Sequence, residues 1–318
     1  MDGTYRPRRT CLSVPGSSPS MIEKAKSLRA DQVFLDLEDS VAPDAKAAAR
    51  TRVAAALTGP GWSGQLLGVR VNDWTTPWTY LDVIEVVSAA GSSLEVIVLP
   101  KVIEAGHVYA LDLLLTQLER GLGLPAGRIG VDVQIEDARG LSDITAIARA
   151  PRVQALVLGP ADLIASLNMR TLEVGEQPQG YDVGDAYHHA LMTILVAARA
   201  NGLAAVDGPF LKVRDDAAFR RVAGRSAALG YDGKWVVHPD QIAAGNEIFT
   251  PRQQDYDRAE LILEAYDWYT SQAGGARGAA MLGAEMIDEA SRKMALVVAG
   301  KGRAAGLQRG PERFVPPG

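Results

Sequence analysis

Residues 32–45 read QVFLDLEDSVAPDA, a segment that begins as an apolar strand and then places Asp36, Glu38 and Asp39 within four positions. A strand interior normally excludes charge, because an unpaired buried ion costs several kcal/mol or changes its pKa until it is neutral. Taken alone, the segment is equally compatible with a strand that ends at solvent before an acid-rich turn. The choice between a solvated turn and a shared pocket depends on the rest of the chain.

Length and composition restrict the class of protein. The chain has 318 residues, 47% hydrophobic and 22% charged, enough for one large α/β barrel with an appendage. The net charge of -5 and the lack of a basic block argue against a nucleic-acid partner. Cys11 is the single cysteine, which excludes an internal disulfide and favours a reducing cytoplasm. No apolar stretch approaches the roughly 18 residues of a membrane span, so we expect a soluble, cytoplasmic protein.

Short apolar runs alternate with segments of helical periodicity along most of the chain. The helical segments include PSMIEKAKSLRA, PDAKAAARTRVAAAL and YALDLLLTQLERGLGL. Eight buried strands that alternate with helices are typical of a (β/α)8 TIM barrel, which we therefore predict. The eight runs are CLSVPG (from Cys11), QVFLDLED (Gln32), LLGVRVN (Leu66), EVIVLPKV (Glu95), GVDVQIED (Gly130), VQALVLGPAD (Val153), LAAVDGPF (Leu203) and KWVVHP (Lys234).

Polar residues gather at the carboxyl ends of these runs. In a TIM barrel this rim of the strands carries the active site, so we expect the acids of LDLED to face a shared pocket. The strand-end residues are Ser17, Glu38, Asp39, Arg70, Asn72, Lys101, Glu136, Asp162, Asp207 and His238.

The part of the chain that follows the eighth predicted strand is expected to form a small appendage. We expect a catalytic barrel over residues 1–250 and a C-terminal helical cap over residues 251–318. Within the cap, residues 274–279 (GGARGA) have the composition of a hinge-like loop, and a helix is expected to resume over residues 284–302.

Glu136 and Asp162 end consecutive predicted strands and are candidate ligands for Mg2+, which prefers carboxylates, waters and substrate oxygens. Each of them could instead cap a loop or pair with a base. Glu38 and Asp39 would then orient water molecules on the metal. Arg70 suits bidentate recognition of a substrate carboxylate, although a structural salt bridge to one of the acids is nearly as compatible. The role of Asp36 stays open, since it can also pair with a base inside the barrel.

Several motifs together resemble a known family. RRTCLSVPGSSPSMIEKAKSLRADQVFLDLEDSVAPDAKAAAR is similar to the N-terminal signature of citrate lyase β-subunit-like enzymes of the HpcH/HpaI aldolase superfamily. VRVND, VIVLPKV, VQIEDARGL, GPADLIAS, VDGPF, LGYDGKWVVHPDQI and NEIFTP resemble, in order, malyl-CoA/β-methylmalyl-CoA lyases. The resemblance covers about residues 8 to 300.

The resemblance implies a TIM barrel that binds Mg2+, or Mn2+ in its place, through Glu136 and Asp162. It implies that Glu38 and Asp39 hold metal-bound waters and that Arg70 contacts the carboxylate of the 2-oxoacid. It also implies that Asp288, within GAEMIDEAS, serves the barrel of a neighbouring subunit in a homo-oligomer, a trimer or a hexamer. Coenzyme A would lie along the barrel mouth, with Arg9 and Lys24 as candidate contacts.

The expected reaction is a reversible Claisen-type cleavage of a malyl-CoA-like 3-hydroxyacyl-CoA into a 2-oxoacid and an acyl-CoA. Asp288 is the candidate for proton transfer, with a basicity raised by desolvation under the cap. The chain departs from its relatives in the loop after Asp162, and the sequence after Asp288 lacks the Pro-His of bacterial citrate lyase β-subunits. A malyl-CoA thioesterase, a metal-dependent aldolase on free 2-oxoacids and a non-catalytic binding protein remain alternatives.

Overall fold

The computed structural model describes residues 5–317, which form two compact units. One unit spans Arg8–Phe249, and the other comprises residues 250–317 together with residues 5–7. No helix among residues 5–317 is both long and apolar enough to cross a membrane.

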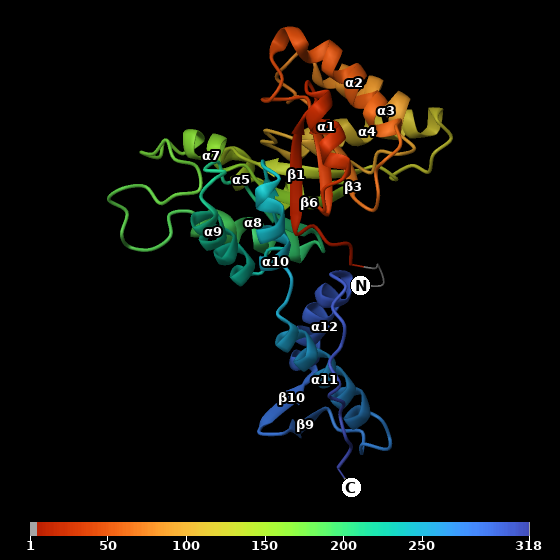
Figure 1. Cartoon of the computed structure of the whole chain (residues 1–318), viewed down its shortest axis with the longest axis vertical. Helices are drawn as coiled ribbons and strands as arrows, with labels where there is room; N and C mark the ends of the chain where they lie inside the picture. Colours follow the sequence, from red (N-terminus) through yellow and green to blue (C-terminus); the bar gives the residue numbers. More distant parts are fainter. Residues whose placement is uncertain (1–4, 318) are drawn as a thin grey trace. The chain divides into compact units, whose positions relative to one another are not determined.

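The first unit is a closed barrel of eight parallel strands in the order β1 to β8, which confirms the predicted TIM barrel (Figure 1). Each strand lies within one of the eight apolar runs or begins a residue before it, because these runs are buried. The strands are β1 Thr10–Pro15, β2 Gln32–Asp36, β3 Leu66–Arg70, β4 Val96–Leu99, β5 Gly130–Ile135, β6 Val153–Leu158, β7 Ala204–Asp207 and β8 Gly233–Val236.

Helices follow the strands and cover the outside of the barrel. Local signals set some of their ends: Ser18 caps α1 ahead of Pro19, and Gly230 ends α9 with a left-handed φ of 112°. The helices are α1 Pro19–Lys26, η1 Pro43–Ala45, α2 Lys46–Thr58, α3 Thr79–Ala90, α4 Ala105–Gly121, α5 Ala138–Ser142, α6 Ile144–Ala148, α7 Pro160–Ser166, α8 His188–Ala200, α9 Asp216–Leu229 and α10 Asp240–Ile248.

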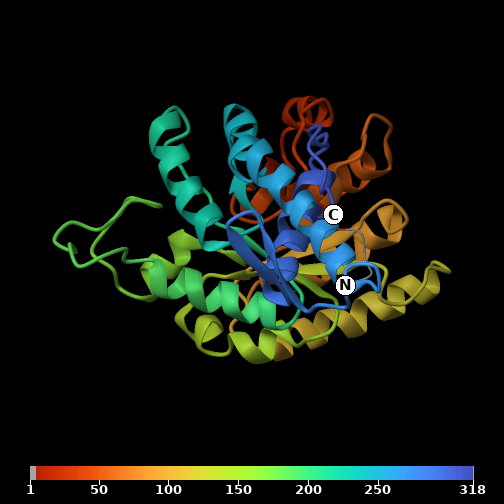
Figure 2. The same ribbon diagram turned by 90° about the horizontal axis from the view of Figure 1, so that it is seen from below.

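The segment 167–187 between α7 and α8 is a long irregular loop that projects from the barrel unit (Figures 1 and 2). Two of its acids, Glu176 and Asp185, form ion pairs with Arg221 and Arg225 of α9. The loop begins beyond α7, the helix that carries Asp162, so it belongs to the mouth end of the barrel.

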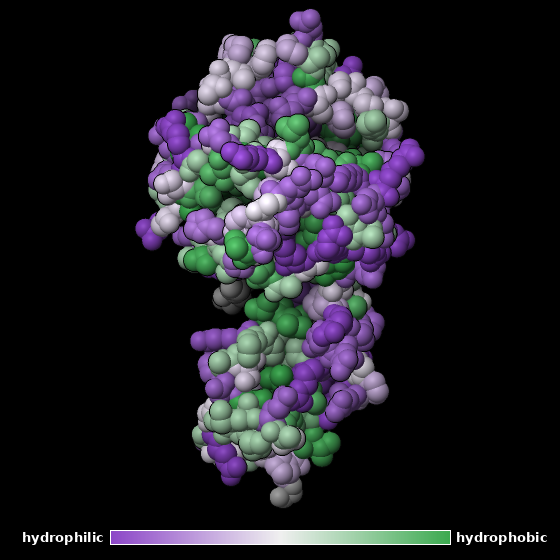
Figure 3. Space-filling view, turned by 90° about the vertical axis from the view of Figure 1, so that its left-hand side faces the viewer, coloured by the Kyte–Doolittle hydropathy of each residue, from purple (hydrophilic) through white to green (hydrophobic). Residues whose placement is uncertain are grey.

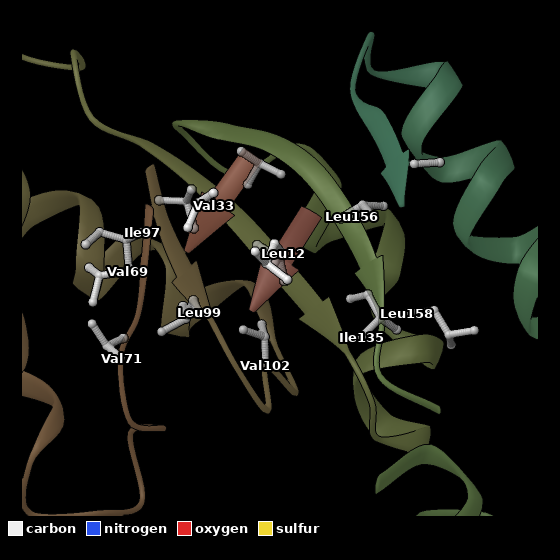
Figure 4. Close-up of a cluster of buried hydrophobic side chains, with 14 of the residues drawn as sticks. Leu12, Val33, Val69, Val71, Ile97, Leu99, Val102, Ile135, Leu156 and Leu158 are labelled. Carbon is white, nitrogen blue, oxygen red and sulfur yellow. The ribbon is translucent and has the colours of Figure 1, made fainter. Parts of the chain in front are cut away.

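The core consists of two layers with different chemistry. Strand residues that face outward pack against the helices as one continuous apolar layer, part of which Figure 4 shows with Val33, Val69 and Leu156. A smaller cluster fills the barrel interior and includes Phe34 and Trp235, whose rings meet edge to face. Alternation along each strand separates the two layers, and it sends every second residue toward the barrel axis.

A buried polar cluster closes the amino-terminal end of the barrel interior. The guanidinium of Arg8 forms an ion pair with Asp132 and donates to Gln32 and Gln154. At the opposite end of the barrel, the acidic residues that follow the strands line a cavity.

The second unit differs from the predicted all-helical cap. Its elements are α11 Gln253–Thr270, β9 Ala279–Leu282, β10 Glu285–Asp288 and α12 Glu289–Ala304. The prediction of a helix from residue 284 is wrong, because Gly283, with φ 64°, turns the chain into an antiparallel hairpin and Ile287 is buried against α11 residues. The helix begins only at Glu289, after Asp288 has capped it.

The segment 274–279 lies close to α11. A Cβ at Gly274 would stand 2.1 Å from the carbonyl oxygen of Trp268, and Arg277 N–H donates to the Tyr269 carbonyl. Its hinge role stays a prediction. Hydrophobic residues are interspersed with hydrophilic ones on the surface of this unit, in the lower half of Figure 3.

Candidate active site

Asp36 is the last residue of β2, and its side chain is fully buried inside the barrel mouth. Its carboxylate accepts hydrogen bonds from Nε and Nη2 of Arg70 at 2.7 and 2.8 Å, and from the backbone N–H groups of Glu38 and Ser40. Burial acts to raise the pKa of Asp36, but the guanidinium of Arg70 and these hydrogen bonds lower it below its ordinary value. Asp36 is therefore the ion-pair partner of Arg70 inside the barrel.

Arg70 ends β3, the strand next to β2, and Asp36 and Arg70 are paired in the strand register. Its Nη1 lies 2.8 Å from Oε2 of Glu38, and its guanidinium carbon lies 4.9 Å from the ring centroid of Trp235. The structural salt bridge that the sequence allowed is thus present. Arg70 also lines the cavity at the mouth, so a contact with substrate stays a prediction.

Glu38 and Asp39 share a second cation, Lys101, which follows β4. The ammonium of Lys101 lies 2.7 Å from Oε1 of Glu38 and 3.4 Å from Oδ1 of Asp39. Burial raises the pKa of Glu38 despite the nearby charge of Arg70. Lys101 was not among the candidate catalytic or binding residues, although its position at the end of a predicted strand was the available signal.

Lys46 holds the backbone of the acidic segment. It is buried at the start of α2, and its ammonium donates to the carbonyl oxygens of Leu37 and Glu38, both at 2.8 Å, and to Asn72 Oδ1. Burial lowers the pKa of Lys46 from its ordinary value. The sequence does not single out Lys46, because a lysine at the start of an alanine-rich helix is usually exposed to solvent.

Glu136 and Asp162, the predicted metal ligands, line one cavity of about 400 Å³. Glu136 directly follows β5 and is 4% exposed, whereas Asp162 lies in the first turn of α7. Burial, followed by the charge of Glu38, raises the pKa of Glu136 to about 8. A Cβ at position 159 would stand 2.3 Å from Oε2 of Glu136, so Gly159 supplies the space for this carboxylate.

The donor set fits a hard divalent cation. Within residues 5–317 there is no group of three or more His, Cys, Asp and Glu side chains arranged to hold a metal. Mg2+ does not need one, since it keeps several waters and takes one or two carboxylates with substrate oxygens. Burial and the charges of Glu38 and Asp162 raise the pKa of Glu136, and a cation bound beside these carboxylates would offset that effect.

The apolar wall of this cavity comes from other elements. Pro160, Pro209, Leu211, Trp235 and Val237 line it beside the carboxylates. The cavity thus has an apolar wall and a charged wall, and the charged wall carries Asp36, Asp39, Glu136, Asp162 and Arg70.

The structure does not bring every candidate to the mouth. Arg9 precedes β1 and therefore lies at the amino-terminal end of the barrel, where its guanidinium pairs with Asp31 at 2.7 Å. Lys24 is exposed in the last turn of α1. His238 is exposed and lies 3.4 Å from Asp240, which fits the turn position expected for it.

Asp288 belongs to the second unit, where it is the N-cap of α12. Its Oδ1 accepts from the N–H and the hydroxyl of Ser291 at 3.0 and 3.2 Å. These hydrogen bonds lower the pKa of Asp288 within its own chain, where the carboxylate is partly exposed and caps the helix. The raised basicity expected from desolvation under the cap stays a prediction.

Comparison with known proteins agrees with this arrangement. The model of the HpcH/HpaI aldolase/citrate lyase family matches residues 9–239. The chain is 41% identical over 302 residues to the L-malyl-CoA/beta-methylmalyl-CoA lyase of Cereibacter sphaeroides, covering 92% of this chain and 94% of that protein. The chain belongs to the HpcH/HpaI aldolase/citrate lyase family.

Solved structures of this family share the fold. A citrate lyase from Burkholderia xenovorans superimposes with a TM-score of 0.83 over 98% of this chain and 96% of that one, and its 22% identity shows the fold alone. Protein CitE from Mycobacterium tuberculosis, in complex with magnesium, acetoacetate and coenzyme A, matches with a TM-score of 0.71 and 26% identity. That match covers 93% of this chain and 98% of that one. The predicted family is thus confirmed.

Proposed function

We propose that this protein is a Mg2+-dependent carbon–carbon lyase that cleaves a malyl-CoA-like 3-hydroxyacyl-CoA into a 2-oxoacid, such as glyoxylate, and an acyl-CoA. Malyl-CoA, β-methylmalyl-CoA and citramalyl-CoA are the candidate substrates. The observation that carries the proposal is the convergence of Glu136, Asp162 and Arg70 on one cavity. The 41% identity to a malyl-CoA/beta-methylmalyl-CoA lyase over nearly the whole chain supports it.

The residues of the mouth divide the work between two halves of the substrate. Glu136 and Asp162 would hold Mg2+, with Glu38 and Asp39 orienting its waters. When bound, the cation acts as a Lewis acid on the carbonyl that forms from the 3-hydroxyl group. Asp36 fixes the orientation of Arg70, whose guanidinium charge would lie beside the carboxylate of the 2-oxoacid half of the substrate. The hydroxyl proton passes to solvent water as the carbon–carbon bond breaks, and the electron pair of that bond stays on the acyl-CoA half as an enolate.

The enolate then takes a proton at the α-carbon of the thioester, and Asp288 is the proposed donor. In the direction of synthesis the same carboxylate removes this proton. The hydrogen bonds from Ser291 make Asp288 a weak base within its own chain. We propose that burial against a neighbouring barrel excludes water and raises its pKa to the range the step requires.

A shared site of this kind requires a homo-oligomer. We propose a trimer or a hexamer, located in the cytoplasm. The second unit exposes Met281, Met286 and Met294, large apolar side chains that suit a contact with another subunit. Coenzyme A would lie at the mouth. Arg9 pairs with Asp31 at the other end of the barrel and Lys24 is exposed in the last turn of α1, so the position of neither residue supports its proposed contact with coenzyme A.

The products distinguish this lyase from its alternatives. The full-length protein is incubated with malyl-CoA and Mg2+, and acetyl-CoA, glyoxylate and free CoA are quantified over time. Equal amounts of acetyl-CoA and glyoxylate are expected. Free CoA with intact malate would identify a thioesterase instead, and turnover of free hydroxyacids without CoA esters would identify an aldolase. A panel of acyl-CoA and 2-oxoacid pairs, assayed in the direction of synthesis, then defines the preferred substrate.

A further inference from the structure

Lys101 has a backbone conformation that non-glycine residues seldom adopt. It follows β4 and Pro100 with a φ of 49°, in the left-handed region. Such conformations gather at functional sites, where the surrounding contacts maintain them. Here the conformation serves two contacts at once: the backbone N–H of Lys101 donates to Oε1 of Glu136 at 2.6 Å, while its ammonium reaches Glu38 and Asp39.

The charges around the mouth show why this ammonium matters. Five carboxyl groups gather there: Asp36, Glu38, Asp39, Glu136 and Asp162. Nε and Nη2 of Arg70 are hydrogen-bonded to Asp36, and only Nη1 contacts Glu38. Among residues 5–317, the ion pair reported for Asp39 is the one with Lys101.

Two like charges cannot lie close together in this mouth without a free-energy penalty. A cation bound by Glu136 and Asp162, with its waters on Glu38 and Asp39, would lie beside the Lys101 ammonium. Repulsion between charges of +2 and +1 separated by several ångströms is substantial even when it is partly screened by solvent.

We infer that Lys101 is a tethered counter-cation, which holds Glu38 and Asp39 in place before the metal arrives and weakens Mg2+ binding by competing for these acids. Its backbone N–H positions Glu136, while its side chain sets the metal affinity. The inference rests on the proposed metal site. Lys101 is a positioning residue, and its role is distinct from that of the ligands.

The left-handed backbone allows the two roles to be separated by substitution. Lys101→Gly and Lys101→Asn both tolerate a positive φ, so they keep the N–H that points to Glu136 while they remove the ammonium. Lys101→Arg keeps the charge and serves as the matched control. Mg2+ dissociation constants are measured by isothermal titration calorimetry on the full chain without substrate, at constant pH and ionic strength.

Lys101→Gly and Lys101→Asn should bind Mg2+ about tenfold more tightly than the unmodified protein, and Lys101→Arg should stay within about threefold of it. Unchanged or weaker binding in both uncharged variants would overturn the inference, since loss of a merely structural contact does not strengthen binding. Glu136→Gln tests the underlying site in the same experiment. If Glu136→Gln binds Mg2+ as the unmodified protein does, the metal site itself is wrongly placed, whatever the Lys101 variants show.

Discussion

The carboxylate of Asp36 and the guanidinium of Arg70 meet in a bidentate pair, with Nε and Nη2 at 2.7 and 2.8 Å from the two oxygens. Both side chains are buried, and their strands are neighbours in register. The flat edge of the arginine is therefore committed to a residue of the protein. Asp36 thereby fixes the plane of the guanidinium, whose third nitrogen, Nη1, lies 2.8 Å from Oε2 of Glu38.

Arg70→Lys is expected to raise the KM for the 2-oxoacid at least about tenfold in the direction of synthesis, because an ammonium group cannot keep the bidentate pair with Asp36 and also reach the substrate carboxylate. Asp36→Asn should raise it as well, since the guanidinium loses its orienting partner. The KM for the acyl-CoA should change little in both variants. Arg220→Lys, an exposed arginine that pairs with Asp216 and Glu247, is the control. Loss of acyl-CoA affinity alone would place Arg70 in the wrong half of the site.

Removal of divalent metal should abolish turnover, and Mg2+ or Mn2+ should restore it. Glu136→Gln and Asp162→Asn should each lower kcat at least about 100-fold, with helical circular dichroism unchanged, because each removes one anionic ligand and keeps its shape. Near-normal activity in either variant would show that the residue is not a ligand.

The pKa of Glu136, raised from 4.5 to about 8, predicts how the metal-free protein responds to pH. A group whose folded-state pKa is raised gives stability that is fully present below about pH 4.5 and is lost as the pH rises through about 8. The melting temperature without metal should therefore fall over this interval, and this component should be absent from Glu136→Gln. Mg2+ affinity should rise by about tenfold per pH unit up to pH 8, as the carboxyl group releases its proton. A melting temperature with the same pH dependence in both proteins would contradict the assignment.

Asp288 has two separable roles, as a helix cap and as the proposed proton carrier. Asp288→Asn keeps a good N-cap but removes the acid, whereas Asp288→Ala also loses the cap, at a cost of about 1 kcal/mol. Both variants should be nearly inactive, and Asp288→Asn should melt close to the unmodified protein. If the Asp288→Asn enzyme is active, Asp288 acts only as the N-cap of α12 and not as a proton carrier.

Mixed oligomers test whether Asp288 acts in trans. Asp288→Ala and Glu136→Ala proteins are dissociated, mixed and reassembled, and activity is followed against the mixing ratio. Some sites should then combine an intact second unit with an intact barrel, so part of the activity should return. If mixed assemblies form and remain inactive, Asp288 either serves its own barrel or has no catalytic role.

The sequence predicts the barrel well because buried parallel strands leave a strong pattern, and the polar residue at each strand end indicates the mouth. Glu136, Asp162 and the Asp36 segment could be placed in this way. The roles of Lys101 and Lys46 could not, since they depend on how far a flexible side chain reaches across neighbouring strands. The β9–β10 hairpin was missed because its strands are short and Ile287 fits a helical spacing equally well. Arg9 was proposed for the mouth from the family resemblance, although its place just before the first predicted strand puts it at the amino-terminal end of the barrel.

The mouth of the barrel requires a residue without a side chain at position 159, next to Glu136. A side chain at this position, even a single methyl group, would enter the space occupied by Oε2 of Glu136. The volume of residue 159 thus determines whether the carboxylate can point into the cavity at all. Substitution with alanine would produce an enzyme whose acids and bases are all intact, yet whose site is too narrow to be assembled.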